Sequence, residues 1–208
     1  NGTLIDESFI NILKKLRRVD LRISFHSIDR STFEKFAGSK DSYNKVIKSI
    51  QMLSDEDVPF SVLTVLTSIN ESTIYNTINY LSSNSIRYAI SPYIFPNIFS
   101  SGNNIDFRPS KEIIDKLTKD GYISKKCSLC GALKTKFWIS CNGDIFPCEM
   151  YRDIKISNIF DEDLREIWHS SIMDKLRNKL TLKELDCNIC VHNPYCNYCP
   201  ALCKTFHR

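Results

Sequence analysis

Nine cysteines constrain this chain more than any other feature of its sequence. All nine fall between Cys127 and Cys203, and the first 126 residues contain none. Their local density exceeds the roughly 8–10% that marks a cysteine-built scaffold. An odd count and a long cysteine-free first part argue against a secreted disulfide framework. Closely spaced thiols of this kind indicate a metal centre.

The spacing of the cysteines narrows the kind of metal site. Pairs separated by two residues recur because a tight turn aims both sulfurs at one centre, and zinc sites and iron–sulfur clusters both use such pairs. The full pattern is Cys127-x2-Cys130-x12-Gly143-x4-Cys148, then Cys187-x2-Cys190-x5-Cys196-x2-Cys199-x3-Cys203. Spacing alone leaves the two metals open. His192 could replace a thiolate in a zinc site, but a solvent-facing histidine is the favoured interpretation because the cysteines already suffice.

Asn142 and Gly143 form the strongest short hairpin signal in the sequence. A type I′ turn there predicts that Cys141 pairs with Asp144 across the hairpin. Cys148 would then lie four residues further along the strand, roughly 13 Å away. That distance is too large for Cys141 and Cys148 to bind one small cluster. Cys141 is therefore predicted to be the odd cysteine, which leaves eight cysteines as two sets of four.

Helical and strand patterns alternate along the first part of the chain. The predicted elements are helices over Asp6–Arg17, Ser42–Leu53, Asn70–Leu81 and Ser110–Thr118, and strands over Leu21–Ile28, Val58–Thr67 and Arg87–Ile94. Strands separated by helices indicate parallel β-α units, in either a doubly wound sheet or a segment of a barrel. A polar linker over 97–109 follows the last strand. A further helix over Asp161–Leu180 is expected to pack through the apolar stripe Leu164, Ile167, Trp168, Ile172 and Leu176.

The first predicted strand has one polar face. Leu21, Ile23 and Phe25 alternate with Arg22, Ser24 and His26. A polar face on a parallel strand suits a barrel interior or a ligand crevice near the carboxyl end of the strand. An edge strand that faces solvent is nearly as good an interpretation.

Charge and hydropathy exclude some classes of partner. The formal net charge of +4 comes from 28 basic and 24 acidic residues spread along the chain, which gives no reason to expect nucleic acid. Apolar runs such as Val62–Leu66 are far shorter than a membrane span, and no signal peptide precedes them. We therefore expect a cytoplasmic protein without membrane contact. Because the sequence opens at Asn1 without a methionine, we also expect it to be an excerpt from a longer protein.

The cysteine pattern resembles the SPASM domain found at the C-terminus of many radical S-adenosylmethionine (SAM) enzymes. Cys130-Gly131-Ala132, the run ISCNGDIFPC over Ile139–Cys148 and the run ISNIFDEDLREIW over Ile156–Trp168 carry this resemblance, with CNYCP over Cys196–Pro200. Upstream, Asn1-Gly2-Thr3, Ile23–Ile28, Thr32–Gly38 and Thr64–Asn70 resemble later strands of the radical SAM barrel.

The resemblance implies an α/β fold in which the later β-α units of a partial radical-SAM (β/α)6 barrel precede a small cysteine-rich α+β SPASM domain with a β-hairpin. The implied boundaries are 1–96 for the partial barrel, 97–126 for a linker and helix, and 127–208 for the SPASM domain. Two departures stand out. The last spacer is shortened to Cys196-x2-Cys199, and no Cys-x3-Cys-x2-Cys motif occurs, so we do not expect this fragment to be active alone.

By analogy with the family, the eight cysteines would bind two auxiliary four-iron four-sulfur clusters. The first would be held by Cys127, Cys130, Cys148 and Cys199, and the second by Cys187, Cys190, Cys196 and Cys203. S-adenosylmethionine and a third such cluster would belong to the full-length enzyme. Ser24 and His26 are candidate contacts for S-adenosylmethionine. Asn70 matches a family position, although a plain helix cap explains it equally well. No catalytic residue is assigned.

The resemblance also implies partners. The expected substrate is a peptide or protein from which a 5′-deoxyadenosyl radical abstracts hydrogen, and the expected electron donor is a flavodoxin or a ferredoxin. Two other readings stay open. One is a radical SAM enzyme that acts on a small molecule or tetrapyrrole, and the other is a structural zinc-binding interaction module.

Overall fold

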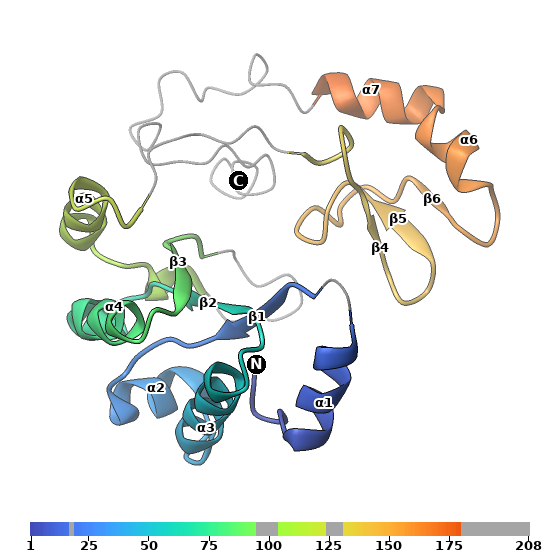
Figure 1. The fold of residues 1–208 in the computed structure, drawn as a ribbon. Coiled ribbons are helices and arrows are strands. Elements are labelled where there is room, and N and C mark those ends of the chain that lie inside the picture. Colours follow the sequence, from blue (N-terminus) through green and yellow to red (C-terminus); the bar gives the residue numbers. More distant parts are fainter. Residues whose placement is uncertain (17–18, 95–103, 124–130, 180–208) are drawn as a thin grey trace. The chain divides into compact units, whose positions relative to one another are not determined.

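The computed structural model describes residues 1–16, 19–94, 104–123 and 131–179, shown as coloured ribbons in Figure 1. The chain divides into two compact units. The first contains the described residues 1–94 and 104–123, and the second contains 131–179. Each unit has its own apolar core, so each is described separately. No helix among the described residues is long and apolar enough to cross a membrane.

Three parallel strands form the centre of the first unit, in the order β1-β2-β3 (Figure 1). They are β1 (Leu21–Ser24), β2 (Phe60–Val65) and β3 (Arg87–Ser91). All three predicted strands are confirmed, although each is shorter than predicted. The first strand stops early because Ser27 and Ile28 turn away from the sheet to bond with Thr73 and Thr77.

Five α-helices and two short 3-10 helices accompany this sheet. They are α1 (Glu7–Lys15), α2 (Arg30–Ala37), α3 (Ser42–Asp55), η1 (Glu71–Thr73), α4 (Ile74–Ser83), η2 (Asn104–Phe107) and α5 (Lys111–Lys119). Side chains cap two of these helices, since the Asp6 side chain accepts a hydrogen bond from the Phe9 amide and Ser110 accepts one from the Ile113 amide. Helix α2 was not predicted as such, although Asp29 caps its start and Gly38 ends it at φ 65°.

One face of the sheet packs against helices. Ile23 and Val62 project from this face into a core shared with α1, α2 and α3, and both are 1% exposed. Helix α5 completes a second core with α4, in which Leu66, Ile78 and Leu117 are fully buried. The other face carries Arg22, Ser24 and Leu63, which are partly or fully exposed in the described part of the chain.

The described part of the second unit contains a sheet of short antiparallel strands. They are β4 (Trp138–Ile139), β5 (Asp144–Phe146) and β6 (Ser157–Asn158), in the order β4-β5-β6. The predicted turn geometry between β4 and β5 is wrong. Ser140, and not Cys141, lies opposite Asp144, with its amide 2.8 Å from the Asp144 carbonyl oxygen. Only Gly143 has positive φ in this loop, at 82°, so the loop has three residues and is not the two-residue type I′ turn.

Two helices follow where one was predicted. Helix α6 (Leu164–Trp168) ends at His169, and α7 (Ser171–Lys179) begins with the Ser170 hydroxyl accepting a hydrogen bond from the Met173 amide. The break between α6 and α7 changes which apolar side chains are buried. Ile167, Met173 and Leu176 enter the core, whereas the predicted stripe members Leu164 and Ile172 are 44% and 52% exposed.

Arg177 connects the two ends of the described part of the second unit through hydrogen bonds. Its Nε lies 2.8 Å from the Leu133 carbonyl oxygen, one Nη lies 2.7 Å from the Trp168 carbonyl oxygen, and the other pairs with Asp174 at 2.7 Å. Leu133 is fully buried and has φ 59°, a left-handed conformation that a bulky side chain rarely adopts. The guanidinium group therefore holds an unusual turn near the start of the described part of this unit.

Candidate functional site

Three residues predicted to contact a cofactor lie together at the carboxyl ends of β1 and β2. Ser24 is the last residue of β1, His26 follows two residues later, and Asn70 follows β2 in the turn before η1. The Asn70 Nδ2 lies 2.7 Å from the His26 carbonyl oxygen, so the structure brings these two residues into contact. The carboxyl ends of parallel strands are where α/β proteins bind ligands.

His26 is held as a neutral imidazole. Its Nδ1 accepts a hydrogen bond from the Val65 amide at 3.3 Å, and its ring stacks on Phe36 with the centroids 3.9 Å apart. Burial lowers the pKa of His26 to about 4, because the charged form would lose its hydration. With Nδ1 occupied as an acceptor, the proton of the neutral ring is on Nε2. His26 can therefore offer one N–H donor to a ligand at neutral pH.

Ser24 projects from the uncovered face of the sheet. The parallel register places it beside Leu63 of β2, and its hydroxyl forms no hydrogen bond with any described residue. It is partly exposed. A hydroxyl in this state can donate or accept one hydrogen bond with a ligand.

Asn70 is fully buried, and its side chain is fully engaged by the protein. Its Oδ1 accepts hydrogen bonds from the Thr67 amide at 2.7 Å and from the Thr67 hydroxyl at 3.1 Å. Its Nδ2 also reaches the Val65 carbonyl oxygen at 2.9 Å. Asn70 occupies the N-cap position of η1, where the alternative interpretation placed it, but its side chain makes no capping hydrogen bond. Asn70 joins the ends of β1 and β2 and thereby sets the backbone around His26.

Of the eight predicted metal ligands, Cys148 is the one within the described residues. The other seven, Cys127, Cys130, Cys187, Cys190, Cys196, Cys199 and Cys203, lie outside them. Cys148 is partly buried and follows β5 in a turn, where the Tyr151 amide lies 3.1 Å from its carbonyl oxygen. Neither Cys148 nor Cys141 forms a disulfide with another described residue. A half-buried cysteine in a tight turn suits thiolate ligation.

Cys141 differs from Cys148 in its surroundings. It is exposed in the hairpin loop, where its Sγ lies 3.6 Å from the Asn142 Oδ1. The corrected register keeps it in the loop, beyond the last pair of the ladder, while Cys148 lies past the other end of β5. Within the described part of the chain, no group of three or more metal-binding side chains gathers.

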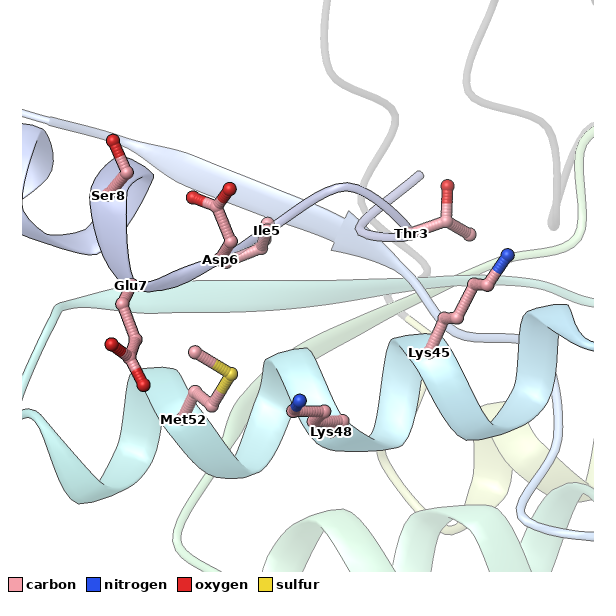
Figure 2. Close-up of a pocket in the computed structure, with 8 residues that line it drawn as sticks. All are labelled: Thr3, Ile5, Asp6, Glu7, Ser8, Lys45, Lys48 and Met52. Carbon is pink, nitrogen blue, oxygen red and sulfur yellow. The ribbon is translucent and has the colours of Figure 1, made fainter.

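A pocket of about 420 Å³ lies elsewhere in the first unit, between the N-terminal segment and α3. Figure 2 shows its lining, with Lys45, Lys48 and Met52 from α3 facing residues around the start of α1. None of the predicted site residues lines this pocket. Asp6, on its wall, is engaged as the cap of α1.

Comparison with known proteins defines the class of this chain. Residues 127–200 match the SPASM family, an iron–sulfur cluster-binding domain. The chain is related to radical SAM/SPASM maturases. The relatives include the antilisterial bacteriocin subtilosin biosynthesis protein AlbA of Bacillus subtilis, 26% identical over 85% of this chain, and a cysteine-type anaerobic sulfatase-maturating enzyme of Clostridium novyi, 20% identical over 94%. The chain spans 43% and 61% of the lengths of these two relatives.

Solved structures share the fold. Streptococcus suis SuiB bound to S-adenosylmethionine matches 97% of this chain and 54% of its own length, with a TM-score of 0.67 and 18% identity. The enzyme anSMEcpe with bound AdoMet matches 95% of this chain and 60% of its own length, with a TM-score of 0.64 and 17% identity. The mixed α/β architecture is therefore similar to the fold of these two structures.

Proposed function

We propose that this chain is the later-strand and auxiliary-cluster part of a radical SAM enzyme that modifies a peptide or protein by hydrogen abstraction. The observation that carries the proposal is the match of residues 127–200 to an iron–sulfur cluster-binding family, over the segment where the cysteines are concentrated. The helix-covered parallel sheet, with its second face uncovered in the described residues, supports its assignment to β-α units of a partial (β/α)6 barrel. S-adenosylmethionine and a reduced four-iron cluster supply the radical chemistry when bound.

Eight thiolates would hold two auxiliary four-iron four-sulfur clusters. Our proposed partition assigns Cys127, Cys130, Cys148 and Cys199 to the first cluster and Cys187, Cys190, Cys196 and Cys203 to the second. Four thiolates are the usual ligand set of such a cluster. The position of Cys148 at the far end of β5 from Cys141 supports a ligand set that contains the first and omits the second.

At the carboxyl end of β1, Ser24 and His26 would contact S-adenosylmethionine. Neither the Ser24 hydroxyl nor the His26 Nε2–H forms a hydrogen bond with a described residue, and the neutral state of His26 makes it a donor without a full charge. Asn70 would act as a positioning residue, because its side chain is already saturated by four hydrogen bonds within the chain. Its contribution would be to hold the His26 backbone in place.

A peptide or protein is the proposed substrate. AlbA is named for the biosynthesis of a bacteriocin, and SuiB has been solved with the precursor peptide SuiA. A tetrapyrrole is the second candidate, because an AdoMet-dependent heme synthase of Methanosarcina barkeri is 23% identical over 97% of this chain. In either case, a flavodoxin or a ferredoxin would provide the electron.

The proposal predicts the iron content of the chain. Anaerobic reconstitution should give a brown protein with about eight irons and eight sulfides per chain, since each cluster contains four of each. The Cys148→Ser variant should lose up to half of this iron, because serine is a poor substitute for a thiolate. Cys141→Ser is the matched control and should retain all of it. A colourless protein with stoichiometric zinc would replace the redox proposal with a structural zinc module.

Binding of S-adenosylmethionine tests the first unit separately. The experiment requires the chain together with the Cys-x3-Cys-x2-Cys segment that we expect upstream. In that protein, Ser24→Ala and His26→Asn should each weaken binding about three- to tenfold, the cost of one lost hydrogen bond. Unchanged affinity in both variants would remove these residues from the site while leaving the cluster proposal intact. Turnover assays with an acidic or cysteine-containing peptide and with a tetrapyrrole would then separate the two substrate classes.

A further inference from the structure

Three polar side chains form a row across the face of the sheet that, among the described residues, the helices do not cover. Arg22 of β1 pairs with Ser61 of β2, and Ser61 pairs with Arg87 of β3. Partners in register on parallel strands project from the same face, and the neighbouring residues Ile23 and Val62 project into the core on the other face. Neighbouring strands lie about 4.8 Å apart, so the Cα atoms of the two arginines are about 10 Å apart, with that of the serine midway between them.

Ser61 has an unmet hydrogen-bonding requirement. Its Oγ is buried and has no hydrogen-bond partner in the described part of the chain. Thr64, which projects from the opposite face of the same strand, satisfies its hydroxyl by donating to the Phe25 carbonyl oxygen at 2.7 Å. Buried polar groups are nearly always paired, so an unpaired hydroxyl between two arginines calls for a ligand.

The charges on either side of Ser61 are also poorly compensated. Arg87 is exposed and forms no ion pair with a described residue. Arg22 has Asp20 near one Nη, at 3.9 Å, and both side chains are largely exposed, at 60% and 78%. Two guanidinium groups on flanking strands repel each other unless an anion lies between them. The planar donor fork of arginine matches the oxygens of carboxylate and phosphate groups.

We propose that Arg22, Ser61 and Arg87 form a binding site for one oxyanion, a carboxylate or phosphate group. The serine hydroxyl would donate one hydrogen bond to the oxyanion at the centre, and each guanidinium group would bind the oxyanion from one side. The site is separate from the proposed cofactor contacts, because Ser24 lies two residues further along β1 than Arg22, about 7 Å away, and His26 lies beyond the end of the strand. The assignment therefore stands independently of the radical SAM proposal.

Titration of the chain with inorganic phosphate, at constant ionic strength set with sodium chloride, tests this site. Isothermal calorimetry should show saturable binding to one site. Arg22→Gln and Arg87→Gln should each weaken it about tenfold, as expected for loss of a charge-assisted hydrogen bond. Ser61→Ala should weaken it about threefold. Arg165→Gln, which removes the same charge from an exposed position in the second unit, should leave it unchanged.

A second titration separates the possible sources of the anion. A short capped peptide with one glutamate is compared with the same peptide carrying glutamine. Stronger binding of the glutamate peptide, lost in Arg22→Gln, would assign the site to an acidic side chain of a polypeptide. Phosphate binding without peptide binding would assign it to a free oxyanion. Absence of saturable binding by both probes, or binding that neither arginine variant alters while circular dichroism shows an intact fold, would overturn the proposal.

Discussion

Lowering the pH should destabilise the first unit through a single side chain, His26. The unfolded chain binds a proton at this histidine below a pKa of about 6.5, whereas the folded protein does not until about pH 4. Between these values the unfolded state binds more protons, so stability falls as the pH falls. From pH 7.5 to pH 5, the loss attributable to His26 is about 2 kcal/mol.

His26→Asn isolates this contribution. Asparagine retains an acceptor near the position of Nδ1, where the Val65 amide donates, but it does not titrate. The variant will be less stable at pH 7.5, since it loses the ring that stacks on Phe36. Its further loss between pH 7.5 and pH 5 should nevertheless be about 2 kcal/mol smaller than that of the natural protein.

Hydrogen exchange followed by mass spectrometry measures this difference locally. Opening free energies of peptides that cover β1 and β2 should show the effect of the variant, whereas peptides that cover β5 in the second unit should not. An NMR titration of the histidine rings gives the pKa directly. A His26 resonance that titrates near 6.5, or an equal pH dependence in the variant and the natural protein, would refute the reasoning.

Three further substitutions probe the other contacts, each by urea unfolding. Asn70→Asp places an oxygen against two carbonyl oxygens in a buried site and should lower the free energy of unfolding by about 3 kcal/mol. The exposed control Asn84→Asp should lower it by less than about 1 kcal/mol. Equal losses in the two variants would contradict the positioning role of Asn70. Gly143→Ala puts a side chain on a residue with φ 82° and places its Cβ 2.7 Å from a ring carbon of Phe160, so it should lower the free energy of unfolding by about 2 kcal/mol. The control Gly38→Ala also has positive φ, but its Cβ meets nothing within 4 Å, and it should lower that free energy by about 1 kcal/mol. Tryptophan fluorescence reports the Gly143 effect, because both tryptophans lie in the second unit. Arg177→Lys loses the bonds to two carbonyl oxygens and should cost about 2 kcal/mol, and an unchanged urea midpoint would exclude a role for the guanidinium fork.

Local signals in the sequence predicted the elements of the first unit well. Asp6 and Ser110, the first residues of two predicted helices, cap those helices, because a cap depends on a few neighbouring residues. The same kind of signal is present at Asp29 and Gly38 around α2 and at Ser170 before α7, but the continuous apolar stripe of the last segment predicts one uninterrupted helix. Apolar periodicity therefore located the helices better than it located their breaks.

The hairpin and the site depended on information that is not local. Asn142-Gly143 indicates a turn, but a glycine with positive φ suits a two-residue and a three-residue loop equally, so the pattern did not fix the register. The four hydrogen bonds of Asn70 and the stacking of His26 on Phe36 join residues from separate elements, and only the folded chain reveals them. The dense cysteines predicted metal binding because that chemistry depends on spacing.

The hydrogen bond between Arg177 and the Leu133 carbonyl oxygen shortens the loop that must close to bring together two proposed ligands of one cluster. Cys130 and Cys199 are 69 residues apart in sequence, but Cys130 precedes Leu133 by three residues and Cys199 follows Arg177 by 22. Once this hydrogen bond has formed, the loop that remains to be closed is about 25 residues long instead of about 69. The shorter loop lowers the entropic cost of closure by about 1 kcal/mol. A side chain with no metal-binding chemistry would in this way favour assembly of the iron site.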